Sequence, residues 1–123
     1  MSKLQQAQKF NDTIFELLKI IHSLSDSTEK YNVDKIRNRL FILLSTGGKE
    51  SLISLASPFY TTFSDLIIDR DEDFFASYEL DEEYGEFTNL FRLVQGKYVK
   101  MSKNEKDYLY GKVKLTLEYW LEY

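Results

Sequence analysis

The fold class is decided by residues 7–24, which read AQKFNDTIFELLKIIHSL. Apolar side chains recur there every three or four residues, the interval at which an α-helix returns to the same face. This stripe consists of Ala7, Phe10, Ile14, Leu17, Ile21 and Leu24. Phe15 and Leu18 widen it, so we expect a first helix that buries a broad face. The polar run 25–28, which reads SDST, should end that helix.

The same period predicts a second helix after a short connection. Asn32 is expected to be its N-cap, because an Asn side chain accepts a hydrogen bond from an otherwise unpaired backbone N–H. The apolar stripe of this helix comprises Val33, Ile36, Leu40 and Leu43, with Phe41 and Leu44 beside it. Gly47 and Gly48 should end it, since glycine readily adopts the left-handed conformation of a C-terminal cap.

A third helical stretch contains a proline, which leaves two alternatives open. Its apolar face comprises Leu52, Ala56, Phe59, Phe63 and Leu66. Pro58 lies inside this pattern and lacks a backbone donor. Either the helix kinks or breaks tightly at Pro58, or Ser57 caps a new helix that has Pro58 as its first residue. The unbroken apolar period favours the kink or tight break.

Two further helices complete the predicted fold. The fourth is marked by Leu80, Tyr84, Phe87, Phe91 and Val94, with Asp81, Glu82 and Glu83 in its first turn and Gly96 at its end. Acidic residues suit the positive end of a helix dipole. Ser102 and Glu105 form a capping-box pattern that should begin the last helix. The inner face of that helix is expected to comprise Tyr110, Val113, Leu117 and Trp120.

Length and composition favour one intracellular domain. A chain of 123 residues suits a single all-α domain over residues 1–123, which we expect to be a compact antiparallel bundle of five or six helices. It contains no cysteine, which excludes disulfides, thiolate zinc sites and cysteine nucleophiles. No signal peptide and no long uncharged apolar run are evident, so we expect a soluble cytoplasmic protein without membrane spans. The abundance of Lys, Phe and Tyr is typical of AT-rich genomes, including those of many large DNA viruses.

The charges are distributed unevenly along the chain. Residues 65–86 hold ten carboxylates and one basic residue, Arg70, whereas 1–64 and 87–123 have balances of +2 and +3. One interpretation is a solvated loop and helix start. The other is a surface that docks a basic protein partner, whose approach the opposite charge would accelerate. In that case the contact residues are predicted to be Asp69, Asp71, Glu72, Asp73, Phe74 and Phe75. The two phenylalanines would be interface anchors, although they could equally fold into the core.

Other chemistries are less well supported by the residues. Asp69, Asp71 and Asp73 have the spacing with which a calcium loop begins, but Phe74 replaces the required glycine and Leu80 the required glutamate. A divalent-metal enzyme that uses these three carboxylates remains an alternative. The run 46–51, TGGKES, lacks the glycine spacing of a phosphate-binding loop. His22, the sole histidine, should be structural or exposed.

The carboxy-terminal third offers two further alternatives. Basic and aromatic residues alternate there in a way that can bind single-stranded nucleic acid. They are Lys97, Tyr98, Lys100, Lys103, Lys106, Tyr108, Tyr110, Lys112 and Lys114. The sequence pI of about 5.0 and the scarcity of arginine argue against that function. Tyr119, Trp120 and Tyr123 could pack across the two-fold axis of a homodimer. We predict a helical protein-interaction module without catalytic residues, metal or cofactor.

Overall fold

The chain folds into a bundle of α-helices. The computed structural model describes residues 1–123 apart from the side chain of Glu82. Within that description there are six α-helices, one short 3₁₀ helix (η1) and no strand. The elements are α1 (Lys3–Ser23), α2 (Ser27–Gly47), α3 (Ser51–Ile68), α4 (Glu72–Ala76), η1 (Glu82–Tyr84), α5 (Glu86–Tyr98) and α6 (Lys103–Glu122). The prediction of an all-α bundle is therefore confirmed.

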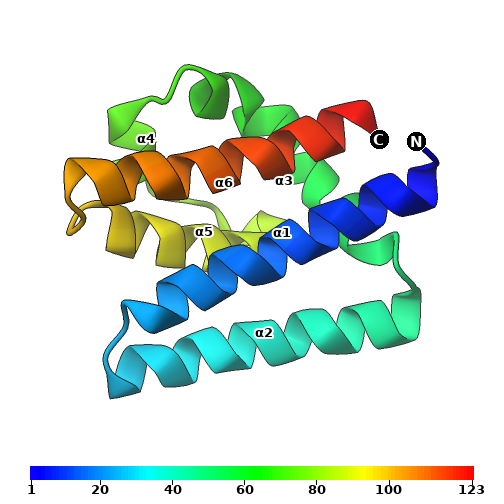
Figure 1. Ribbon diagram of the computed structural model, residues 1–123, viewed down its shortest axis with the longest axis horizontal. Coiled ribbons are helices and arrows are strands. Elements are labelled where there is room, and N and C mark those ends of the chain that lie inside the picture. The colour runs from blue at the N-terminus through cyan, green and yellow to red at the C-terminus, as the bar shows by residue number, and fades with distance from the viewer.

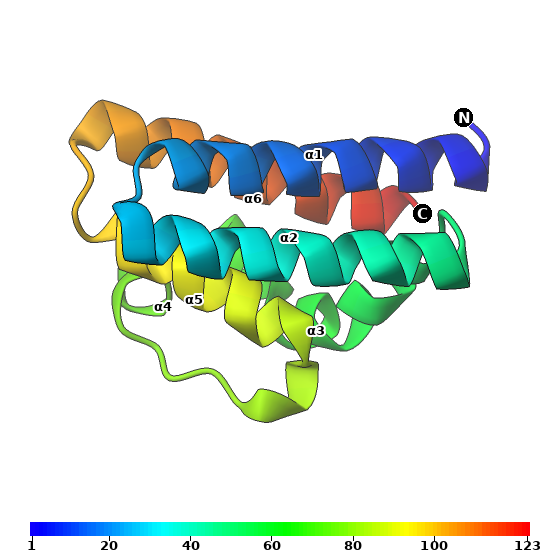
Figure 2. The same ribbon diagram turned by 90° about the horizontal axis from the view of Figure 1, so that it is seen from below.

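The helices are arranged around α1. In Figure 1, α1 crosses the middle of the bundle, α2 lies along its lower edge, and the end of α3 and α4 lie at the upper edge. α6 packs along α1, and the two chain ends lie at the same end of the molecule. Figure 2 shows α3 and α5 on the side of the bundle away from α1. Among the helices described, none is long and apolar enough to cross a membrane.

The core is built largely from aromatic rings contributed by α1, α3, α4 and α5. The ring of Phe59 lies 4.7 Å from that of Phe91, and the ring of Phe10 lies 6.1 Å from that of Tyr60. All four side chains are buried. The Tyr60 hydroxyl is 2.6 Å from the Thr116 hydroxyl of α6, so this polar group is paired inside the core. Burial raises the pKa of Tyr60, which stays neutral.

The predicted boundary between the first two helices is wrong by several residues. α1 ends at Ser23, and α2 begins at Ser27 with Asp26, rather than Asn32, as its N-cap. The Glu29 N–H donates to Asp26 Oδ1 at 2.8 Å, and the Asp26 N–H donates to Glu29 Oε1 at 3.1 Å. This capping box pairs two backbone donors at once, which the single Asn32 side chain could not do.

The predicted fourth helix is also corrected. α5 begins at Glu86, and residues 82–84 form the separate turn η1. Gly85 has a φ of 57°, a left-handed conformation that glycine adopts without steric cost and that separates the two elements. Gly96 does not end α5, which continues to Tyr98. α4 was not predicted, because a helix of five residues is too short to show a period.

Two other boundaries agree with the sequence patterns, and the helix that contains Pro58 is unbroken. α2 ends with Gly48 as C-cap at a φ of 87°. α3 is one continuous helix with Pro58 inside it, so the structure has neither the tight break at Pro58 nor the new helix capped by Ser57. Ser102 and Glu105 form the predicted capping box of α6, with the Glu105 N–H donating to Ser102 Oγ at 3.3 Å.

Candidate functional site

The acidic stretch 65–86 covers the corner between α3 and α4 and the connection to α5. Its first part ends α3, whose C-cap is Asp69. The chain then turns at Arg70, and Asp71 begins α4 as its N-cap. In Figure 1 this corner lies at the edge of the bundle opposite α2. The predicted contact residues therefore lie at one corner, but they have different roles there.

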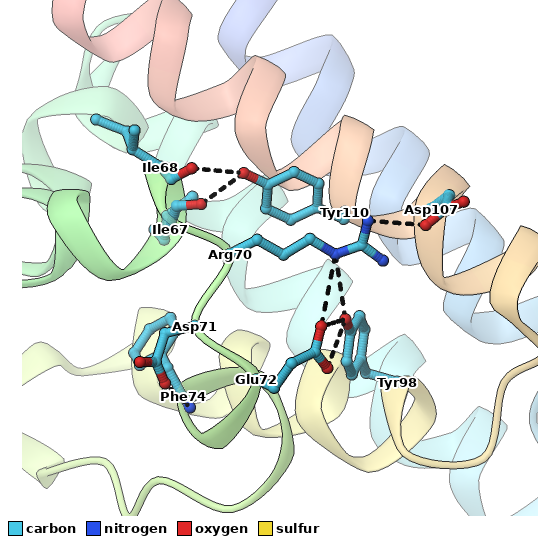
Figure 3. Close-up of polar contacts among 9 residues, drawn as sticks. All are labelled: Ile67, Ile68, Arg70, Asp71, Glu72, Phe74, Tyr98, Asp107 and Tyr110. Atoms are coloured by element: carbon cyan, nitrogen blue, oxygen red, sulfur yellow. Dashed lines mark hydrogen bonds and ion pairs between the residues drawn. The ribbon is translucent and has the colours of Figure 1, made fainter.

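Arg70 turns the chain and fastens the corner to α6. Its φ of 49° is left-handed, a conformation that costs about 1–2 kcal/mol for a residue other than glycine. Its Nη1 lies 2.7 Å from Asp107 Oδ1, and its guanidinium carbon lies 4.7 Å from the centre of the Tyr110 ring. The Tyr110 hydroxyl donates to the Ile67 carbonyl at 2.7 Å (Figure 3). These contacts hold Arg70 in its left-handed conformation.

Glu72 ties the same corner to α5. The Tyr98 hydroxyl donates to Glu72 Oε1 at 2.9 Å, and Arg70 Nε donates to the Tyr98 oxygen at 3.3 Å (Figure 3). Tyr98 is only 1% exposed, and burial raises the pKa of its phenol, so the hydroxyl keeps the proton that it donates. Glu72 was predicted to contact a partner, but its carboxylate already has two neighbours within the molecule, Tyr98 and Arg70.

Asp71 and Gln95 fix the start and the end of α4. Asp71 Oδ1 accepts a hydrogen bond of 2.8 Å from the Phe74 N–H and so satisfies a donor at the helix start. Gln95 Nε2 on α5 donates to the carbonyls of Phe74 at 2.8 Å and of Tyr78 at 2.9 Å. The Gln95 side chain is buried, and its contacts hold the chain on both sides of the end of α4 against α5.

Phe74 and Phe75 are core residues. They are 1% and 0% exposed, so the interpretation of them as exposed interface anchors is wrong for this structure. The ring of Phe74 lies 5.3 Å from that of Phe63, and the ring of Phe75 lies 5.2 Å from that of Tyr98. The alternative that they fold back into the core is the correct one. Burying two large rings is what holds such a short helix in place.

A subset of the carboxylates has no such internal role. No side chain that the structure describes forms an ion pair with them, and all are exposed. This subset is Asp65, Asp69, Asp73, Glu79 and Glu83. Asp81 is not part of it, because its Oδ1 accepts a hydrogen bond of 3.4 Å from the Glu83 N–H. We call Asp65, Ile68, Asp69 and Asp73, which lie at the corner of α3 and α4, the acidic edge. Ile68 is 48% exposed, which places an apolar group among the charges.

The metal alternative gains no support from the geometry. Among the described side chains, no group of three or more His, Asp or Glu residues converges in a way that could hold a metal ion. Asp71 points back to cap its own helix, whereas Asp69 and Asp73 are exposed. A hard cation needs several oxygen ligands within one coordination sphere.

The lysines and tyrosines of the carboxy-terminal third do not share one open face. Lys97 is buried and contacts Glu29 at 2.8 Å, and Lys112 contacts Glu16 at 2.8 Å. Tyr98 is buried, and Tyr110 is bound to α3. Of the four remaining lysines, Lys100, Lys103 and Lys114 are exposed. Lys106 is half-buried, with its Nζ 5.1 Å from the centre of the Tyr98 ring.

The aromatic residues proposed for a homodimer pack within the molecule. The ring of Trp120 lies 5.5 Å from that of Tyr60, and Lys3 Nζ lies 4.8 Å from the centre of the Tyr123 ring. The Tyr123 hydroxyl also donates to Glu50. Elsewhere, His22 lies on the surface 3.5 Å from Asp34. The run 46–51 is the end of α2 and the start of α3.

The sequence interpretation missed the polar cluster at the corner. Arg70 was recognised only as the single basic residue among ten acidic ones. That isolation was a usable signal, since a lone arginine in an acidic stretch often binds carboxylates. Its partners Tyr98, Asp107 and Tyr110 lie far away in sequence, so spacing could not identify them. Comparison of the chain with protein-family models, with curated proteins and with solved structures gave no match.

Proposed function

We propose that this protein is a small helical interaction module and that its acidic edge docks a basic protein partner. One observation carries the proposal: Asp65, Asp69 and Asp73 are exposed and have no ion-pair partner among the described side chains. Other acidic residues nearby cap a helix or bind Tyr98 and Arg70, so their presence is explained by the fold. Asp73 lies in the first turn of α4, where the helix dipole favours an acidic residue, but Asp65 and Asp69 have no such structural explanation.

The setting of these carboxylates supports an interface. Asp65, Ile68 and Asp69 share one face of α3, because residues three and four positions apart lie side by side on a helix. The corner is fixed by Arg70, so little conformational freedom has to be lost when a partner binds. Exposed charges accelerate association with a partner of opposite charge. An apolar side chain among them can be buried when the partner binds.

The experiment is an affinity capture with three baits, made in an extract of the organism that encodes the protein. The first bait is the wild type and the second is Asp65→Lys/Asp69→Lys. Both substitutions place a cation in or next to the last turn of α3, where the helix dipole favours it, so folding should be preserved. The third bait is Asp12→Lys/Glu122→Lys, which changes the net charge equally on exposed residues of α1 and α6.

A protein retained by the wild type and by the α1/α6 control, but lost from the acidic-edge variant, would support the proposal. It would then be purified, and its affinity should fall as salt increases, because exposed charges are screened. A partner lost equally from both variants would show only a dependence on net charge. That result, or retention of the same proteins by all three baits, would refute the acidic edge as the docking surface.

A further inference from the structure

The helix at the opposite edge of the bundle has a solvent face that the fold leaves uncovered. Of the 21 residues of α2, the buried ones are Val33, Ile36 and Leu40. Tyr31 and Ile42 are 64% and 63% exposed. Because residues 31, 35 and 42 are separated by four and seven positions, they follow one line along the helix.

This solvent face is also basic. We call six of its exposed side chains the basic face of α2, namely Tyr31, Lys35, Arg37, Arg39, Phe41 and Ile42. The ring of Phe41 lies at the border of this face, 4.6 Å from that of Phe15 on α1. Both carboxylates of the helix are engaged inside the molecule. Glu29 contacts Lys97 at 2.8 Å, and Asp34 contacts Arg37 at 3.2 Å. Arg37 is thereby paired, and Arg39 Nη1 lies 3.4 Å from Glu86 Oε1 on α5. Lys35 is therefore the cation of this face that has no carboxylate partner among the described side chains, and it lies beside the exposed apolar groups Tyr31 and Ile42.

We infer that the basic face of α2 binds the acidic edge of a second copy of this chain, so that copies associate head to tail. The two surfaces have opposite charge, and each contains exposed apolar groups, Tyr31 and Ile42 on α2 and Ile68 on the acidic edge. They lie at opposite edges of the molecule in Figure 1, so the two surfaces of one copy cannot contact each other. A contact between different surfaces of identical chains leaves one of each free and propagates.

The small area of the solvent face of α2 limits the strength of this association. A helix of 21 residues is about 30 Å long and about 10 Å wide, so its solvent face covers roughly 300 Å². A stable interface buries about 800 Å² on each partner. We therefore expect a weak, reversible association that depends on protein concentration. Raising the ionic strength from about 0.1 M to about 1 M shortens the screening length from about 10 Å to about 3 Å, which should weaken it roughly tenfold or more.

The test is sedimentation velocity over a range of protein concentrations at the lower salt. One variant, Lys35→Gln/Ile42→Gln, removes charge and apolar area from the basic face while keeping good helix formers. The other is Asp65→Lys/Asp69→Lys on the acidic edge. Circular dichroism should show unchanged helix content in both. The wild type is expected to form species larger than dimers, and each variant alone should sediment as a monomer.

An equimolar mixture of the two variants gives the most specific result. One variant retains only the acidic edge and the other only the basic face, so the mixture should form dimers and nothing larger. A wild type that stays monomeric at all concentrations would overturn the inference. So would a variant that still associates alone, or a mixture that remains monomeric while the wild type associates, because either result points to another interface.

This inference uses the surface on which the proposed function rests, but the two can fail separately. The Lys35→Gln/Ile42→Gln variant keeps the acidic edge, so it should still retain the captured basic partner. If self-association is absent while capture depends on the acidic edge, the proposed function stands and the inference fails. If copies associate while capture retains no other protein, the second copy is itself the basic partner.

Discussion

Replacing Arg70 tests whether its contacts hold the corner between α3 and α4. In Arg70→Ala the ion pair with Asp107 is lost. Because both groups are partly exposed, this pair should contribute about 0.2–1 kcal/mol to the free energy of unfolding. The hydrogen bond to Tyr98 contributes about 0.5–1.5 kcal/mol, and the cation–π contact with Tyr110 about 0.5–1 kcal/mol. The free energy of unfolding should therefore fall by about 2 kcal/mol.

Arg70→Gly provides the matched comparison. Glycine loses the same contacts but removes the steric cost of a φ of 49°, about 1–2 kcal/mol. We expect Arg70→Gly to be more stable than Arg70→Ala by about 1 kcal/mol, despite the greater flexibility of glycine in the unfolded chain. The assay is urea unfolding followed by circular dichroism. With a slope of about 2 kcal/mol per molar urea, the alanine variant should shift the midpoint by about 1 M.

Two results would refute this reasoning. If Arg70→Ala changed the free energy of unfolding by less than about 0.5 kcal/mol, the contacts of the side chain would contribute little. If Arg70→Gly were less stable than Arg70→Ala, the left-handed conformation would not be a source of strain. Amide hydrogen exchange gives a local check, because protection at residues 71–78 should fall in Arg70→Ala more than in the remainder of the bundle.

Two further predictions concern the core and the pH dependence. Phe75→Ala should lower the free energy of unfolding by about 3–5 kcal/mol in urea titrations, whereas Tyr78→Ala, at a residue 46% exposed, should cost less than about 1 kcal/mol; similar costs would contradict the burial of Phe75. Lys97 holds the pKa of Glu29 below its ordinary value of 4.5, so this contribution to stability is present above that pH and is lost as the pH falls through the lowered pKa. Glu29→Gln keeps the capping pattern but loses the charge, so its stability should vary less with pH below 4.5, and an unchanged profile would exclude this pair as a cause.

Periodicity was sufficient to predict the long helices. The stripe from Ala7 to Ile21 is buried in α1, as expected, because one face of a long helix must meet the core. Local hydrogen-bonding patterns located the start of α6 at Ser102 and the end of α2 at Gly48. Both signals lie within a few residues of the boundary that they mark, so no tertiary information is needed to recognise them.

The predictions were wrong where two local signals competed for one helix start, or where a side chain contacts residues that are distant in sequence. Asn32 has the side chain of an N-cap, but the capping box of Asp26 and Glu29 begins six residues earlier and pairs two donors instead of one. Phe74 and Phe75 adjoin acidic residues, and sequence alone could not show that Phe74 packs against Phe63 and Phe75 against Tyr98. The exposed line of Tyr31, Lys35 and Ile42 was not predicted, because the apolar period of α2 identifies the face that packs against the core and carries no information about the opposite face.

The central claim is that the acidic edge is a docking surface, and the most direct measurement is the affinity of the captured partner for three forms of the protein. Isothermal titration should give equal affinities for the wild type and for Asp12→Lys/Glu122→Lys. We predict that Asp65→Lys/Asp69→Lys binds at least about tenfold more weakly, with the difference shrinking at high salt. Equal affinities for all three forms at low salt would contradict the claim and leave these carboxylates as solvated charges.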